Sequence, residues 1–136
     1  MKLICGEIVE GKGALALLAL RMAAGPAFIL HGWGKVQHAT SWMGEGLPAA
    51  VQAMVAFGEF AAGIAFLVGF LTPLAGLGMI PIMLGAILLV HIPKGDPFVG
   101  GGGSWELAAV YLAVSVALML RGAGAYSIDA YLNKKK

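Results

Sequence analysis

The chain has 136 residues, of which 60% are hydrophobic and only 12% are charged, and its formal net charge is +2. So little charge cannot cover the surface of a soluble domain of this length. The composition therefore predicts a membrane protein whose main partner is the lipid bilayer. The weak positive charge, concentrated at the end of the chain, also argues against a surface that binds nucleic acid.

Four apolar segments, taken in chain order, predict four membrane-spanning helices, because a bilayer core of about 30 Å accepts helices of roughly 20 residues. They cover residues 13–32, 48–70, 72–93 and 104–121. The second and third segments have almost no linker and predict an antiparallel hairpin, whereas the glycine-rich stretch "PKGDPFVGGGGS" precedes the fourth. The expected fold is all-α: one four-helix membrane domain over residues 1–136, with a basic tail at 122–136.

The distribution of Lys and Arg predicts the orientation, since cytoplasmic segments of membrane proteins retain positive charge. Two positive residues, Lys35 and Lys94, fall in the loops that four spans place on one side. The terminal segments hold Lys2, Lys12, Arg121 and Lys134–Lys136. Both termini are therefore expected in the cytoplasm, and Arg21, within the first apolar segment, argues against a cleaved signal peptide.

One carboxylate, Glu59, interrupts the otherwise apolar stretch "MVAFGEFAAGIAFLVGF". Arg21 lies 11 residues before Gly32 and Glu59 lies 11 residues after Pro48. Both are therefore expected about 16 Å deep, near the midplane, where an ion pair between the first two helices offsets the cost of burying two charges. Such a pair is either a structural contact that fixes helix order or part of a polar pocket for a proton, an ion or a redox ligand.

Further ionisable residues gather near the expected outer membrane boundary. The segment "HGWGK" ends the first span, "HIP" ends the third and "SWELA" opens the fourth. Glu106 is expected to face the bundle, because Ala109, Ala113 and Ala117 place small residues on its side of the helix. These positions predict one ligand-binding pocket bounded by His31, Lys35, His91 and Glu106 above and by Arg21 and Glu59 below.

Few residues suit a metal or a covalently held cofactor. The two histidines that end spans come without a spaced carboxylate or thiolate motif, so no metal site is predicted. The single cysteine, Cys5, excludes an intramolecular disulfide and offers no zinc, iron–sulfur or c-type haem motif. No residue can be assigned as catalytic from these patterns.

Several segments, in the same order, resemble the bacterial DoxX family across about residues 21–132. They are "RMAAGPAFILHGWGK", "FGEFAAGIAFLVGFLTPLAGLG", "HIPKGDPF", "GGSWELAAVYLA" and "GAYSIDAYL". The resemblance implies a four-helix bacterial inner-membrane protein, in a family with some members tied to quinone-linked sulfur oxidation or to oxidative-stress defence. The family pattern falls on Arg21, His31, Lys35, Glu59, His91 and Glu106, but it supplies no catalytic assignment.

The function that these patterns favour is a small membrane component of a redox system, with a quinone-like ligand between the helices. His91 or His31 would donate to a ligand carbonyl, and Glu59 or Glu106 would exchange the proton. Arg21 with Lys35 would stabilise the developing anion. The electrons would come from a redox protein partner or from a bound cofactor.

Two alternatives remain open beside this function. The first is a non-catalytic assembly or scaffold subunit of a membrane complex, in which the polar residues only fix helix packing and partner contacts. The second is a transporter, which four spans without a clear internal repeat disfavour unless the chain forms a homo-oligomer.

Overall fold

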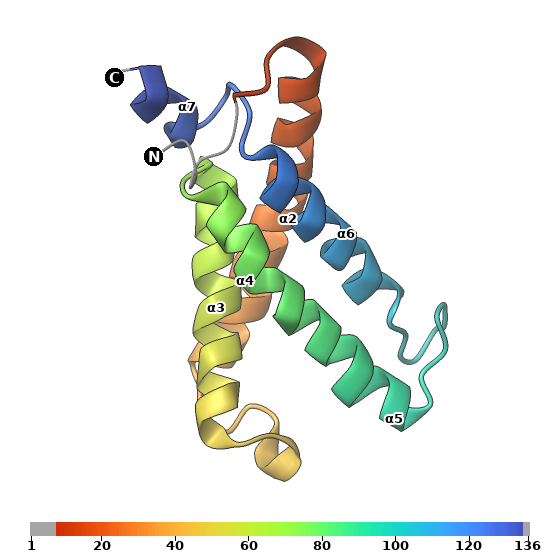
Figure 1. Cartoon of the computed structure of the whole chain (residues 1–136). Helices are drawn as coiled ribbons and strands as arrows, with labels where there is room; N and C mark the ends of the chain where they lie inside the picture. The colour runs from red at the N-terminus through yellow and green to blue at the C-terminus, as the bar shows by residue number, and fades with distance from the viewer. Residues whose placement is uncertain (1–7, 135–136) are drawn as a thin grey trace.

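The structure, a computed structural model, describes residues 8–134, and within that range the chain is helical with no strand (Figure 1). Lys2, Cys5, Lys135 and Lys136 lie outside the described residues. The long helices are α2 (Gly11–Val36), α3 (Ala49–Val68), α4 (Thr72–Gly85) and α6 (Glu106–Arg121). Shorter elements are the 3₁₀-helix η1 (Gly44–Gly46), the π-helix η2 (Ala86–His91), α5 (Ile92–Lys94) and α7 (Ile128–Lys134). The predicted all-α membrane fold is confirmed.

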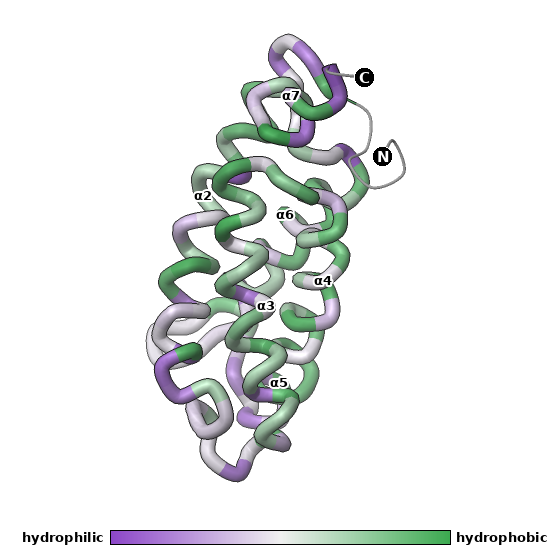
Figure 2. The backbone as a smooth tube through the Cα atoms, turned by 90° about the vertical axis from the view of Figure 1, so that its left-hand side faces the viewer, coloured by the Kyte–Doolittle hydropathy of each residue, from purple (hydrophilic) through white to green (hydrophobic). Residues whose placement is uncertain are grey.

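Among the described residues, three helices are long and apolar enough to cross a bilayer: Gly11–Val36, Ala49–Val68 and the continuous run Thr72–Lys94. The fourth, α6, has 16 residues and is shorter than the roughly 20 that a full crossing needs. Figure 2 shows hydrophobic residues along most of the helices and hydrophilic residues mainly at the two ends of the molecule. This distribution fits a bundle whose long axis runs across the membrane.

The helices form two antiparallel pairs, α2 with α3 and α4 with α6 (Figure 1). Glycines permit the close approach within each pair. A Cβ atom on Gly63 would lie 2.6 Å from the Ile29 nitrogen, and one on Gly76 would lie 2.7 Å from the Ser115 oxygen. Membrane helices associate mainly by such close packing, because lipid is as apolar as a leucine side chain.

Large side chains from all four long helices meet at the centre of the bundle. Phe28 packs against Phe66 and Tyr111, with ring centroids 6.0 Å and 4.8 Å apart. Met79 and Leu118 complete this cluster and are fully buried. The core therefore joins the two helix pairs around their middle and leaves their ends to be held by polar contacts.

The segment after α6, which was expected to be a basic tail, folds back onto the bundle. The Ala125 N–H donates to the Val9 carbonyl at 2.9 Å, and the Asp129 N–H donates to the Gly69 carbonyl at 2.9 Å. Asp129 and Ala130 are buried. This segment therefore covers the end of the molecule at which the chain turns from α3 into α4 (Figure 1).

Candidate functional site

Glu59, on α3, forms an ion pair with Lys35, which lies in the last turn of α2. The Lys35 ammonium nitrogen is 2.6 Å from Oε1 and 2.7 Å from Oε2 of Glu59. The Glu59 side chain is only 4% exposed, against 24% for Lys35. The same ammonium lies 4.7 Å from the centre of the Trp42 ring, within the range of a cation–π contact. Because an ammonium has three hydrogens, two bonds to Glu59 leave one donor for a further acceptor.

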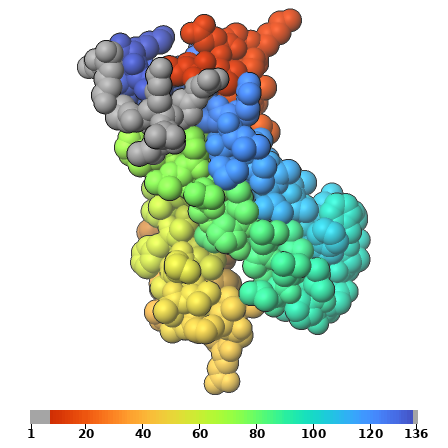
Figure 3. Space-filling view, in the orientation of Figure 1, coloured from red at the N-terminus to blue at the C-terminus, as the bar shows by residue number. Residues whose placement is uncertain are grey.

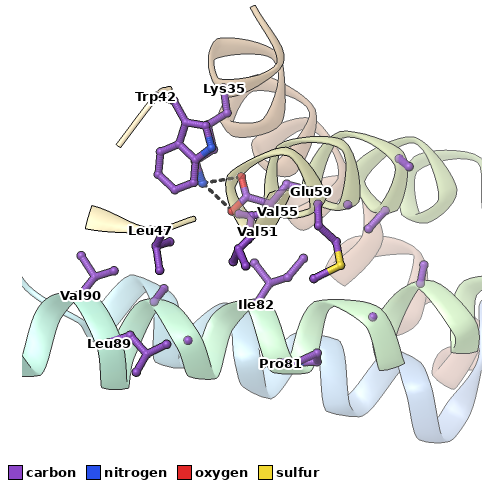
Figure 4. Close-up of a pocket in the computed structure, with 18 of the residues that line it drawn as sticks. Lys35, Trp42, Leu47, Val51, Val55, Glu59, Pro81, Ile82, Leu89 and Val90 are labelled. Atoms are coloured by element: carbon purple, nitrogen blue, oxygen red, sulfur yellow. Dashed lines mark hydrogen bonds and ion pairs between the residues drawn. The ribbon is translucent and has the colours of Figure 1, made fainter. Parts of the chain in front are cut away.

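This pair forms part of the wall of a cavity of about 860 Å³ between α3 and the α4–η2–α5 run. Figure 4 shows the Lys35 and Glu59 side chains at one side of the cavity, beneath the Trp42 ring, opposite the α4–η2 helix. The other walls are largely apolar and include Val51, Val55, Ile82, Leu89 and Val90. A large apolar space with few polar groups is typical of small-molecule sites, and its volume falls within their usual range of roughly 300–1,000 Å³.

His91 lines the same cavity at the end near α5, away from the α3–α4 turn. Its Nδ1 atom is 2.7 Å from an Asp96 carboxylate oxygen, and both side chains are partly exposed. When Nδ1 donates its proton to this carboxylate, Nε2 remains as the nitrogen that can accept a proton. The cavity therefore has two polar positions: the Lys35–Glu59 pair and the His91–Asp96 pair at its mouth.

The π-helix η2 determines how the chain presents His91. Pro93 has no N–H to donate to the carbonyl four residues back, so a regular α-helix cannot continue unchanged through this point. The Ile92 N–H instead bonds to the Ile87 carbonyl, and the Asp96 N–H bonds to the His91 carbonyl at 3.1 Å. Widened turns of this kind occur often at functional sites, and here the turn ends at the histidine that borders the cavity.

Arg21 does not pair with Glu59, and that prediction is wrong. Arg21 is 1% exposed and donates to four main-chain carbonyls. Nε and Nη2 bond to Phe66 and Leu67 at 2.7 and 3.1 Å, and Nη1 bonds to Ala123 and Tyr126 at 3.0 and 2.8 Å. The guanidinium therefore donates to main-chain carbonyls at the C-terminal end of α3, where the helix dipole also favours a cation.

The error has a physical cause in the register of α2 against α3. Counting depth from Gly32 and Pro48 assumed that the two helices end at the same level. In the structure α2 continues to Val36, and Gly63 packs beside Ile29. Arg21 consequently lies near the end of α3, whereas Glu59 lies beside the last turn of α2.

Asp129 supplies the opposite charge at the same end of the molecule. Its carboxylate accepts from the Leu71 N–H at 2.9 Å and from the Thr72 N–H at 3.1 Å. These N–H groups open α4, where the positive end of the helix dipole favours an anion. Arg21 and Asp129 thus hold the two ends of the α3–α4 turn, and we call them the turn clamp.

Comparison with known proteins identifies the family. The sequence matches the DoxX family model over residues 16–92. The chain belongs to the DoxX family. It is also 33% identical over 131 residues to "Inner membrane protein YqjF" of Escherichia coli (strain K12), covering 89% of this chain and 95% of that protein. No solved structure matches. Together with the three candidate spans, these matches support a bacterial inner-membrane protein.

The region that matches the DoxX family includes Arg21, Lys35, Glu59 and His91, and Glu106 lies beyond it. Of the six residues that were predicted to share a pocket, the structure brings Lys35, Glu59 and His91 to one cavity. Arg21, His31 and Glu106 do not line it. The structure therefore brings three of the six residues together at this cavity and places the other three elsewhere.

His31 and Glu106 are both exposed on the surface of the bundle. Glu106 was expected to face the other helices, but it is the first residue of α6, where a carboxylate is favoured near the N-terminal dipole without any partner in the bundle. The series Ala109, Ala113 and Ala117 therefore does not indicate the side of the helix that Glu106 faces. Neither residue takes part in the cavity.

Gln52 is a structural residue that the sequence patterns did not single out. It is 1% exposed, and its amide accepts from the Met43 N–H at 2.9 Å and donates to the Gly44 and Leu47 carbonyls, both at 2.7 Å. Its main-chain carbonyl accepts from the Trp42 indole N–H at 3.0 Å. Gln52 therefore holds the loop that places Trp42 over Lys35. The sequence feature that could have identified Gln52 is its position as a single amide side chain inside an apolar segment.

Proposed function

We propose that this DoxX protein is a small membrane component of a redox system and that it binds a quinone-like ligand between α3 and α4. The observation that carries the proposal is the Lys35–Glu59 pair in the wall of an otherwise largely apolar cavity. Ionisable groups within a membrane are costly, and they commonly mark ligand or proton pathways. A quinone head group has carbonyl oxygens for such donors and a ring for the apolar walls.

The cavity residues suit the proton chemistry of a quinone. The third Lys35 hydrogen can donate to a ligand carbonyl and stabilise the anion that forms on reduction. Glu59, or His91 through Nε2, can exchange a proton with the ligand hydroxyl. Reduction of a quinone to a quinol takes two electrons and two protons. In this proposal a separate redox protein supplies or removes the electrons.

The proposed orientation places both termini in the cytoplasm. Lys12, Arg121 and Lys134 lie toward the end of the molecule at which the chain begins and ends (Figure 1). Lys35 and Lys94 belong to the opposite end, and the cavity opens there between α3 and α5. In this orientation the His91–Asp96 pair is on the periplasmic side.

Accessibility of engineered cysteines tests the orientation. On a Cys5→Ser background, Ser41→Cys should react with an impermeant thiol reagent added to spheroplasts, and Asn133→Cys should react only after lysis. The opposite labelling pattern would show that the termini are outside.

Ligand binding tests the function. The protein is purified in nanodiscs with its native lipids, and co-purifying quinone is quantified by mass spectrometry. Glu59→Gln and Lys35→Met should lower the bound quinone by about tenfold, since each change removes a charged hydrogen-bonding group from the site. Glu45→Gln, in the exposed η1 turn, is the matched control and should retain it.

Absence of bound quinone from the parent protein, together with failure to bind an added quinone analogue, would overturn the proposal. A folded protein that instead co-purifies in fixed stoichiometry with other membrane subunits, and does so equally well after Glu59→Gln, would favour the assembly-subunit function.

A further inference from the structure

The cavity is far longer than a quinone ring requires. On α3 its lining runs from Val51 to Ala65, and on the facing α4–η2–α5 run it extends from Leu74 to Lys94. At about 1.5 Å per residue, the fourteen steps from Val51 to Ala65 give a length of about 21 Å. This length is about two thirds of the thickness of the hydrocarbon core, which is about 30 Å. The Lys35–Glu59 pair lies partway along it, so an apolar half remains between the pair and the α3–α4 turn.

The cavity opens along its side rather than only at its end. Several side chains that line it are also largely exposed: Met54 by 69%, Leu74 by 54% and Leu89 by 66%. Figure 3 shows the molecular surface hollowed between α3 and the α4–α5 arm. In a membrane this opening faces lipid, so a ligand can enter sideways from the bilayer.

Small residues line the half between the Lys35–Glu59 pair and the turn. Ala61 and Ala65 of α3 face Ala75 and Gly78 of α4 there. A Cβ atom on Gly78 would meet nothing within 4 Å, whereas one on the neighbouring Gly76 would lie 2.7 Å from Ser115 of α6. Gly76 therefore serves helix packing, and Gly78 leaves space open.

We call the half of the cavity between the Lys35–Glu59 pair and the α3–α4 turn the inner half; it is lined by Ala61, Ala65, Leu74 and Gly78. We propose that the inner half holds the hydrocarbon tail of the ligand. The ligand is then a long-chain amphiphile of the isoprenoid-quinone type, with its head group beside Lys35 and Glu59 and its tail directed toward the α3–α4 turn. This inference rests on the proposed function and specifies the class of ligand for the same site.

The polar lining favours an amphiphile over a helix of a partner or of a second copy. The third hydrogen of the Lys35 ammonium remains for a further acceptor, which a head-group carbonyl supplies, whereas the main-chain carbonyls of a helix are already bonded within it. A hydrocarbon chain with a ring at its end also matches the apolar walls on either side of the pair. The Lys35–Glu59 pair partway along the cavity favours such a ligand over a bulk lipid chain, because a hydrocarbon chain has no polar group that could bond to the pair.

The experiment compares two quinone analogues that share a head group, one without a tail and one with an isoprenoid tail carrying a photoreactive group at its end. Binding to the full chain in nanodiscs is measured as retained analogue per mole of lipid, after subtraction of empty nanodiscs. Gly78→Leu places a side chain in the inner half at a position where its Cβ atom meets nothing within 4 Å, and Gly34→Leu is the matched control because a Cβ atom there also meets nothing within 4 Å.

Gly78→Leu should weaken binding of the tailed analogue by about fivefold and leave the tailless analogue within about twofold. The effect is modest because the surrounding lipid is as apolar as the cavity, so the tail loses only its packing against the cavity walls. On illumination, the tailed analogue should label peptides within residues 61–78 in the parent and in Gly34→Leu, and this labelling should disappear in Gly78→Leu.

Labelling confined to lipid or to other helices, or equal weakening of both analogues by Gly78→Leu, would overturn the tail position while the head-group site stands. If neither analogue binds the parent protein, the proposed function itself fails. Equal labelling by a photoreactive phospholipid that competes with the tailed analogue would identify bulk lipid as the occupant and would also overturn the inference.

Discussion

The two ends of the α3–α4 hairpin both contain charge within the bundle, but they satisfy it in different ways. At the turn, Arg21 and Asp129 bond to main-chain groups at the helix ends. At the open end, Lys35 and Glu59 bond to each other beside a cavity. A charge held by the backbone fixes the fold. A charge pair beside open space remains available to a ligand, so the partner of a membrane charge indicates its role better than its depth does.

The first prediction attacks the turn clamp and has the largest expected effect. Arg21→Met removes the side-chain donors from four main-chain carbonyls of α3 and of the segment after α6, and it removes the positive charge near Asp129. The free energy of unfolding should fall by about 3 kcal/mol or more. Denaturant titration in detergent micelles measures this loss. Arg121→Met, an exposed arginine at the end of α6, is the control and should change stability little.

The second prediction concerns the contact between α2 and α3 in comparison with the gap between α3 and α4. Gly63→Ala places a methyl group 2.6 Å from the Ile29 nitrogen and 2.8 Å from the Gly25 carbonyl oxygen. The helices must separate, which should cost about 1–3 kcal/mol. Gly78→Ala should cost nothing, because its space is open. Equal stability of the two variants would contradict the described packing of α2 on α3.

The third prediction tests the anionic half of the turn clamp. Asp129→Asn keeps one side-chain acceptor but loses the charge and the second acceptor for the Leu71 and Thr72 N–H groups. The cost should be about 1–2 kcal/mol, smaller than that of Arg21→Met because the main-chain contacts of Arg21 persist. The same titration measures it. A larger loss than in Arg21→Met would show that the carboxylate, and not the guanidinium, dominates this end.

Much of the fold follows from the sequence, because it depends on properties that are local along the chain. Apolar length predicts the long helices, and the short "GFLTP" connection predicts the hairpin. Arg21 and Glu59 stand out correctly as costly residues. The sequence predicted Arg21 as the partner of Glu59 instead of Lys35, because the register of α2 on α3 depends on close contacts such as Gly63 with Ile29.

The candidate site was less predictable because its members meet only after the helices pack. Lys35 reaches Glu59 since α2 continues past Gly32, and Trp42 covers the pair because Gln52 holds the intervening loop. His91 reaches the cavity through a π-helix, which no simple period predicts. The segment after α6 was expected to be a cytoplasmic basic tail, since the roles of Asp129 and of the Ala123 and Tyr126 carbonyls exist only in the folded state.

The last prediction has the smallest effect and separates the two ends most directly, through two double-mutant cycles. Lys35→Met and Glu59→Gln should be coupled by about 1 kcal/mol, because each removes the partner of the other. Arg21 and Glu59 share no contact, so Glu59→Gln combined with a milder Arg21→Lys change should be additive within about 0.5 kcal/mol. Coupling in the second cycle and additivity in the first would restore the Arg21–Glu59 pair that depth counting suggests. It would also remove the reason for treating the open end, rather than the turn, as the ligand site.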